Sequence, residues 1–136
     1  MKELRVTASL ENLDEVQEFI RKELEGYHVS ARTMGQIDVC VEEIFVNIAH
    51  YAYEPETGEA IVGCEVIQGN PAKLRINFTD WGKPFNPLEK EDADVTLAAE
   101  ERKIGGLGIF MVKKMMESVE YRYEDGRNIL TMWKEL

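Results

Sequence analysis

The chain has 136 residues, which suits one domain with one hydrophobic core, and 44% of its residues are hydrophobic, as in an ordinary globular protein. Its formal net charge at pH 7 is −10. Because such an acidic surface repels nucleic acids and anionic membranes, we expect neither as a direct partner.

The N-terminal segment and the cysteines indicate the compartment. The first residues contain no apolar run typical of a secretory signal, and no stretch approaches the roughly 20 apolar residues of a membrane span. Cys40 and Cys64 are isolated, without the spacing of metal ligands, so we expect both to be reduced core residues. These features predict a cytoplasmic protein.

The first part of the chain predicts a strand followed by two helices. Residues 2–8 alternate between apolar and polar side chains, as a half-buried strand does. Residues 13–24 carry an apolar stripe with helical spacing, and Gly26 ends this helix. A second, longer helix is expected over residues 31–53, before a turn at residues 55–58.

The second helix carries polar residues along one narrow stripe. At about 100° per residue, four residues fall on the same side: Glu43, Asn47, His50 and Glu54. One interpretation is the solvated face of a surface helix. The other is a ligand site, because a carboxamide offers a neutral oxygen to a divalent cation, and a carboxylate one turn away can orient or deprotonate a hydroxyl. His50 could line such a site or simply pack beside it.

Two strands of a hairpin are expected next, over residues 60–67 and 73–79. Asp80-Trp81-Gly82 follows directly. Asp and Gly are common turn residues for backbone reasons, so this segment could be only a turn. A carboxylate at the end of a strand is also well placed to accept a hydrogen bond from an amino group, and the glycine lets a flat ligand approach the backbone.

A long polar segment separates this hairpin from the next helix. Residues 86–104 are mostly acidic, and a linker of this length inside a compact domain is typically a lid, a binding loop or a disordered segment. Residues 105–108, Gly-Gly-Leu-Gly, then open a helix expected over residues 109–118. Bare amides and the positive end of a helix dipole suit a phosphate, although the same glycines could serve only as a hinge.

The chain ends in a second hairpin. Strands are expected over residues 119–123 and 128–133, joined by a turn of the Asp-Gly type. Thr131 points to one face of the last strand.

The order and spacing of these motifs are more specific than any one of them. Together they resemble the GHKL-type (Bergerat-fold) ATPase domain. The matching series is a helix with Glu-x-x-x-Asn, two strands, Asp-x-Gly, a long lid, a Gly-Gly-x-Gly helix start and a closing hairpin. Bacterial sensor histidine kinases, type II topoisomerases, 90-kDa heat-shock chaperones and mismatch-repair ATPases share that domain. The short form, with a helix ending in a His-x-x-Tyr-like sequence, looks most like the stand-alone anti-sigma-factor serine/threonine kinases.

The resemblance implies a role for each motif at the phosphate end of an ATP site. Asn47 matches the asparagine that holds Mg²⁺ against the triphosphate. Glu43 matches the carboxylate that acts as a base or orients the attacking hydroxyl, and His50 is a further residue that could line the pocket. The phosphate-cradling loop at the end of the lid corresponds to Gly105, Gly106, Leu107 and Gly108.

The resemblance also implies roles for three residues at the adenine-binding end of the ATP site. Asp80 matches the residue that accepts a hydrogen bond from the adenine amino group, and Gly82 matches a glycine that keeps the adenine pocket open. Thr131 matches a threonine that supports the adenine-binding aspartate by a hydrogen bond or through water.

We therefore expect an α/β fold of the α+β two-layer type, in which helices cover one face of a mixed, mainly antiparallel sheet. Residues 1–136 are expected to form a single ATP-binding domain. By resemblance, the protein would be a kinase that uses ATP and Mg²⁺ to phosphorylate a serine on a small anti-sigma-factor antagonist of the STAS type. A sigma factor or another regulator is a possible second partner, and the family often forms homodimers.

Two other interpretations remain open. The chain could be a nucleotide-gated protein-binding module with little or no kinase activity. It could also be a detached ATPase piece of a histidine kinase, although it contains no pair of helices that carries a phosphoacceptor histidine.

Overall fold

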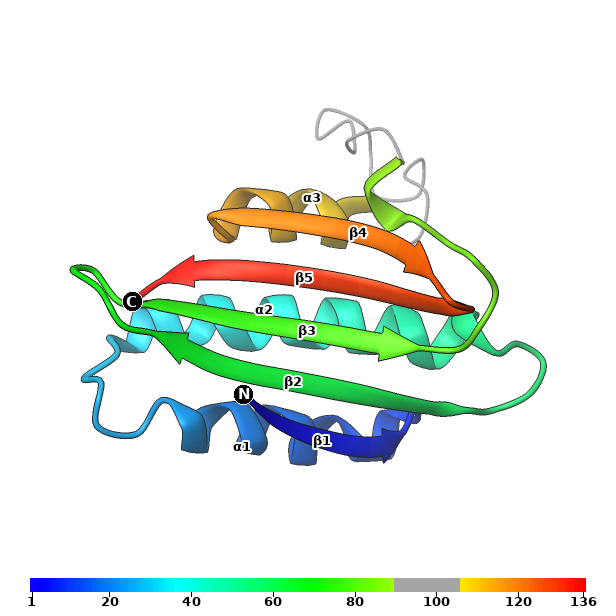
Figure 1. Ribbon diagram of the computed structural model, residues 1–136, viewed down its shortest axis with the longest axis horizontal. Coiled ribbons are helices and arrows are strands. Elements are labelled where there is room, and N and C mark those ends of the chain that lie inside the picture. Colours follow the sequence, from blue (N-terminus) through cyan, green and yellow to red (C-terminus); the bar gives the residue numbers. More distant parts are fainter. Residues whose placement is uncertain (90–105) are drawn as a thin grey trace.

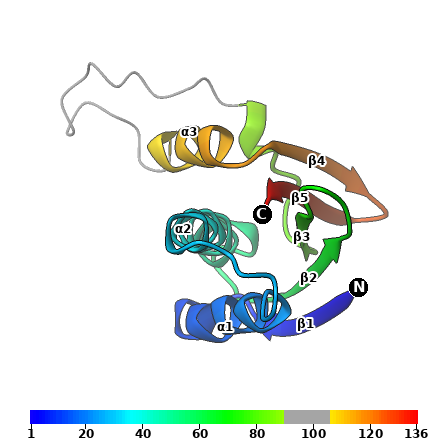
Figure 2. The same ribbon diagram turned by 90° about the vertical axis from the view of Figure 1, so that its left-hand side faces the viewer.

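The computed structural model of the protein describes residues 1–89 and 106–136, and it has two layers. One layer is a five-stranded sheet in the order β1-β2-β3-β5-β4. The other consists of helices α1, α2 and α3, which all cover the same face of the sheet, with α2 between the other two (Figures 1 and 2). The strands are β1 (Lys2–Thr7), β2 (Glu59–Ile67), β3 (Lys73–Asp80), β4 (Ser118–Glu124) and β5 (Arg127–Glu135), and the helices are α1 (Leu13–Glu23), α2 (Ala31–Asn47) and α3 (Gly106–Met115).

The predicted α+β two-layer fold is confirmed, and its sheet is more regular than expected. All four strand pairings are antiparallel, rather than mixed. Both predicted hairpins are present, and Asp125 and Gly126 in the second turn have positive φ angles of 53° and 76°, as the Asp-Gly turn requires. The register places Asp80 between Ala60 of β2 and Asn128 of β5. A polar pair therefore lies side by side at one end of the sheet.

The core lies between the sheet and the helices. Alternate residues of β3, namely Leu74, Ile76 and Phe78, point inward and are almost fully buried. They pack in one hydrophobic cluster with the apolar side of α2, which includes Ile37 and Phe45. The apolar side chains that recur at every second residue in the strands thus pack against those that recur with helical spacing in α2.

Helix α2 differs from its prediction at its C-terminal end. Ser30 caps its start by accepting a hydrogen bond from the Thr33 backbone N–H at 3.1 Å. The α-helix ends at Asn47 instead of continuing to Tyr53, and the next residues, Ile48–Ala52, form a π-helical turn. A π-helical turn is wider than an α-helical one and shifts the side chains that follow it around the helix axis. Helix α3 begins at Gly106, three residues before the predicted Ile109.

In the two described segments, no helix combines the length and the apolar character that crossing a membrane would require.

The two cysteines give a direct test of the core. Both are buried, and burial raises the pKa of Cys40 to about 11 and that of Cys64 to about 12. Because the thiolate is the reactive form, native protein at pH 8 should resist a small thiol reagent, whereas protein in guanidinium should react at two sites per chain. Mass spectrometry of the alkylated protein measures both. Rapid modification of either cysteine in native protein would contradict this packing.

Candidate functional site

A cavity of about 50 Å³ lies at the end of the sheet where β3 ends and β5 begins. Helix α2 and its π-helical turn form one wall, and the segment that follows β3 forms another. Two predicted site residues, Asn47 and Asp80, line it together. The other lining residues are Ile44, Ile48, Tyr51, Ala52, Phe78, Lys83, Phe85, Pro87, Tyr121, Asn128 and Leu130.

Asp80 is the buried carboxylate of this cavity, with only 5% of its surface exposed. Its Oδ1 accepts hydrogen bonds from the Gly82 backbone N–H and from the Asn128 side-chain Nδ2, each at 2.9 Å. Burial raises the pKa of Asp80, and these two hydrogen bonds partly oppose the rise. Within residues 1–89 and 106–136, no donor contacts Oδ2. Asp80 can thus accept a further hydrogen bond from a ligand in the cavity.

Asn128 is the functional side chain that the sequence interpretation missed. It is 6% exposed, and its Nδ2 also donates to the Lys83 carbonyl oxygen at 2.9 Å. Its Oδ1 accepts from the Phe85 backbone N–H at 3.1 Å and from the Tyr121 hydroxyl. One carboxamide therefore fixes both the Asp80 carboxylate and the segment that forms a wall of the cavity. Strand alternation could have placed Asn128 on the inward face with Leu130, where a polar side chain needs partners.

The structure places Thr131 on the opposite face of the sheet from Asp80. Residues 128, 130 and 132 of β5 face the helices, so Thr131 faces away from them. There it lines an open hollow of about 380 Å³ together with Arg75, Asn77 and Trp133. Thr131 therefore does not contact Asp80, and the expectation that it supports this carboxylate is wrong. Asn128 provides that support.

Glu43 and Asn47 lie together, one helical turn apart on α2. Asn47 Nδ2 donates to Glu43 Oε1 at 3.3 Å. Glu43 also packs closely against the start of α3, because a Cβ atom added to Gly108 would lie only 1.9–2.2 Å from the atoms of the Glu43 carboxylate. The absence of a side chain at Gly108 thus allows α3 to approach this carboxylate.

His50 is not among the residues that line the cavity. It is exposed, and its ring makes a T-shaped contact with the neighbouring Tyr51 ring, with 5.9 Å between ring centroids. The prediction extended a regular α-helix through this position. The π-helical turn changes that register, so Tyr51 and Ala52 follow Asn47 toward the cavity instead.

Gly82 lies where two backbone segments meet. A Cβ atom at this position would lie 2.2 Å from the Ala52 carbonyl oxygen, so no larger residue fits. The next residue, Lys83, donates its backbone N–H to the same oxygen at 3.0 Å. The segment after β3 is therefore held directly against the end of the π-helical turn.

The remaining predicted positions are only partly described. Gly106 and Leu107 form the first residues of α3, and Gly105 lies outside the described residues. Of the expected lid, residues 86–89 are described and residues 90–104 are not. Among the described residues, no group of three or more His, Cys, Asp or Glu side chains could hold a metal ion.

Comparison with known proteins relates this geometry to a family. A family model described as the histidine kinase-like ATPase domain matches residues 6–134. The serine-protein kinase RsbW of Listeria monocytogenes is 27% identical over 106 residues, which cover 74% of this chain and 66% of the relative. RsbW of Listeria innocua is 26% identical over the same coverage. The serine/threonine-protein kinase BtrW of Bordetella bronchiseptica is 23% identical over 103 residues, or 76% of this chain and 71% of the relative.

These matches confirm the resemblance inferred from the sequence motifs. The aligned region accounts for about two thirds of the length of the Listeria relatives. The family model, in contrast, spans nearly all of this chain, from β1 to β5. The chain belongs to the histidine kinase-like ATPase domain family.

Proposed function

We propose that the protein binds ATP with the adenine at the Asp80 end of the cavity. The observation that carries this proposal is the buried Asp80 carboxylate, whose Oδ1 is occupied by Gly82 and Asn128 while Oδ2 can accept from the adenine amino group. A base also stacks well against aromatic side chains. Tyr51 and Phe85 line the cavity and are each 42% exposed. The space beside them is smaller than a purine, so binding would require these rings to shift.

The triphosphate would extend toward α2 and the start of α3. Asn47 would give Mg²⁺ one neutral oxygen ligand, and the phosphates would supply others, as is usual for Mg²⁺ bound with a nucleotide. The bound ion would neutralise charge on the phosphates. The backbone amides at the start of α3, including those of Gly106, Leu107 and Gly108, suit a phosphate oxygen, and we propose that Gly105 extends this cradle. Asn47 lines the cavity, and Glu43, to which Asn47 is hydrogen-bonded, packs against Gly108 near the start of α3.

We further propose that the reaction is phosphoryl transfer from ATP to a serine hydroxyl. Glu43 would accept the hydroxyl proton as the serine oxygen bonds to the γ-phosphorus, and the bond from that phosphorus to the β–γ bridging oxygen would break, with ADP leaving. The names of the relatives, which are serine and serine/threonine protein kinases, support this reaction class. His50, which is exposed, has no role in it.

The substrate we propose is a small anti-sigma-factor antagonist of the STAS type, in a partner-switching system in the cytoplasm. A sigma factor or other regulator would be the second partner, and the kinase would act as a single domain over residues 1–136 that forms a homodimer. Residues 86–104 would cover the bound nucleotide. These assignments rest on the family and on the resemblance of the motifs.

ATP affinity tests the base-binding end. In titrations with ATP and Mg²⁺ by calorimetry, Asp80→Asn should weaken binding by about 10- to 100-fold, because a buried acceptor is replaced by a donor facing the adenine amino group. Asn47→Ala should weaken binding by about tenfold or more through loss of the Mg²⁺ ligand. Asp14→Asn, an exposed carboxylate on α1, is the matched control and should bind like wild type. Unchanged affinity in Asp80→Asn would contradict the proposed orientation of the base.

The stability of Asp80→Asn should depend on pH in a defined direction. Because the pKa of Asp80 is raised in the folded state, ionising it costs stability, and this cost grows as the pH rises through that pKa. Without nucleotide, the variant should be at least as stable as wild type at pH 8. As the pH falls toward 4, the free energy of unfolding of wild type should increase relative to that of the variant. Thermal melts of both proteins across this range measure the difference. The opposite slope would show that burial does not dominate at Asp80.

Substitution of Glu43 separates phosphoryl transfer from binding. Glu43→Gln keeps the size of the side chain but removes the base, so transfer to a serine substrate should fall by about 100-fold or more while ATP affinity stays within about threefold. The adjacent Glu42→Gln is exposed and should retain full activity. Radiolabelled ATP and candidate antagonist proteins provide the assay. Wild-type protein that binds ATP but transfers no phosphate to any antagonist would favour the nucleotide-gated binding module.

A further inference from the structure

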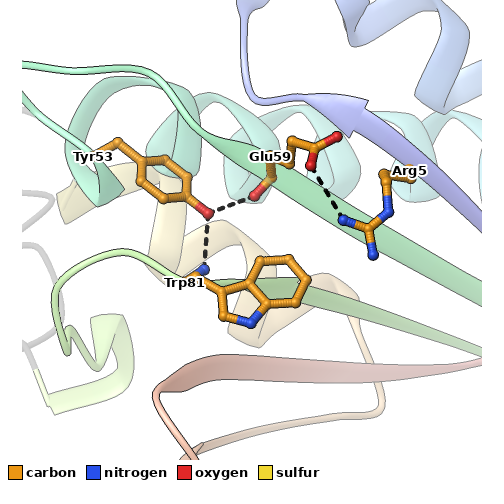
Figure 3. A network of polar contacts seen from close by, with 4 residues as sticks. All are labelled: Arg5, Tyr53, Glu59 and Trp81. Carbon is orange, nitrogen blue, oxygen red and sulfur yellow. Dashed lines mark hydrogen bonds and ion pairs between the residues drawn. The ribbon is translucent and has the colours of Figure 1, made fainter.

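Tyr53 forms a polar bridge at the rim of the ATP site that we propose (Figure 3). It follows the π-helical turn, and its hydroxyl lies between the backbones of β2 and of the segment after β3. The hydroxyl accepts a hydrogen bond from the Trp81 backbone N–H at 2.8 Å and donates one to the Glu59 carbonyl oxygen at 2.5 Å. Burial raises the pKa of Tyr53, so the hydroxyl keeps the proton that it donates.

This bridge takes the place of a backbone hydrogen-bonded pair between β2 and the residue after β3. The ladder between β2 and β3 ends at the pair Ala60 and Asp80, so Glu59 and Trp81 would form the next pair. In a regular antiparallel ladder, their backbone groups could bond directly at about 2.9 Å. The Tyr53 hydroxyl instead lies between these backbone groups, so the two backbone segments separate immediately after Asp80.

Three consecutive amides after Asp80 are each held by a different partner. Trp81 N–H donates to the Tyr53 hydroxyl, Gly82 N–H to Asp80 Oδ1 and Lys83 N–H to the Ala52 carbonyl oxygen. Two of these partners, Ala52 and Tyr53, belong to the end of the π-helical turn and the residue after it. The backbone path that lets Gly82 bond to Asp80 is therefore set by the π-helical turn that follows α2 and by the residue after that turn.

The surroundings of Tyr53 leave its ring little freedom. A Cβ atom added to Gly58 would lie 2.3 Å from the Tyr53 ring, so the glycine provides the space that the ring fills. On the outer side, Arg5 forms an ion pair with Glu59 at 3.2 Å, and its guanidinium lies 5.5 Å from the centre of the Trp81 ring (Figure 3). Those outer contacts are exposed and contribute little on their own. The hydroxyl bridge is the specific contact.

We propose that Tyr53 is a positioning residue for adenine recognition, because its hydroxyl fixes the Trp81–Gly82 backbone that aims Asp80 Oδ2 into the cavity. Tyr53 is not among the cavity-lining residues and acts through Asp80 rather than by touching the nucleotide. This inference rests on the proposed function, since it assumes that adenine binds at Asp80. It adds a determinant of base selectivity that lies outside the cavity.

Removal of the hydroxyl tests the inference. In titrations with Mg²⁺, Tyr53→Phe should raise the dissociation constant for ATP by about five- to tenfold. The same variant should change the dissociation constant for purine riboside triphosphate, which lacks the amino group that Asp80 accepts from, by less than about twofold. Tyr27→Phe is the matched control, because the Tyr27 hydroxyl also holds one side-chain hydrogen bond, from Gln68 at 3.0 Å, far from the cavity. It should leave both constants unchanged.

A second variant disrupts the hydrogen bonds of the Tyr53 hydroxyl without changing Tyr53 itself. Gly58→Ala should push the Tyr53 ring away while keeping its hydroxyl, and should reproduce the selective loss of ATP affinity. Gly35→Ala, where an added Cβ meets nothing within 4 Å, is its control. Circular dichroism and thermal melts establish that each variant is folded at the temperature of the titration.

The outcomes separate this inference from the function on which it rests. A loss confined to ATP supports the positioning role. Equal losses for both nucleotides, or no loss in either Tyr53→Phe or Gly58→Ala, would overturn it while leaving ATP binding intact. Wild-type protein that fails to bind ATP at millimolar concentration would overturn the proposed function, and the inference with it.

Discussion

The site depends on one buried carboxylate and on the groups that hold it. An ionised side chain as deeply buried as Asp80 is costly unless hydrogen bonds compensate for the lost water. Asn128 and the Gly82 amide supply part of that compensation, at one oxygen only, so the carboxylate is fixed in orientation and its other oxygen is still able to accept. The antiparallel register of β3 and β5, which sets Asp80 opposite Asn128, is what makes the arrangement possible. The fold of the sheet and the chemistry of the cavity thus rest on the same pairing.

Helix α2 and the turn that follows it connect this cavity to the start of α3. The last turns of α2 place Glu43 against the start of α3 and Asn47 at the cavity. The π-helical turn that follows, and the residue after it, bring Ala52 and Tyr53 against the segment after β3. A regular α-helix would carry these residues around its axis in a different register. The continuous segment of α2 and the wider turn therefore contacts both the start of α3 and the segment after β3, in line with the frequent occurrence of such turns at functional positions.

Much of the fold could be predicted from the sequence, because period 2 in the strands and helical spacing in α1 and α2 are strong local signals. The positions of Glu43, Asn47 and Asp80 followed from spacing and resemblance, and the structure brings Asn47 and Asp80 to one cavity with Glu43 beside Asn47. Thr131 does not support Asp80, because the resemblance rests on residue type and carries no information on which face of β5 the residue occupies. Strand alternation puts Thr131 on the face of the sheet opposite to Asn128 and Leu130.

Two other features could not be obtained from local patterns. Nothing in the periodicity of residues 48–52 distinguishes a π-helical turn from an α-helical one, so His50 was expected on the wrong side of the helix. The contribution of Asn128 depends on a pairing between residues 48 positions apart in the chain, which only the sheet register reveals. Residues 90–105, which include Gly105 and most of the expected lid, lie outside the described segments, so their predicted roles stay predictions.

The most direct test of this account is a nuclear magnetic resonance titration of ¹⁵N-labelled protein with ATP and Mg²⁺. The account predicts saturable shifts that are largest for the Asn128 side-chain NH₂ and the Gly82 backbone amide, since both donate to the carboxylate that would receive the adenine amino group. Saturable binding that shifts resonances around Thr131 and Asn77 on the open face of the sheet, and leaves Asn128 and Gly82 unmoved, would contradict it.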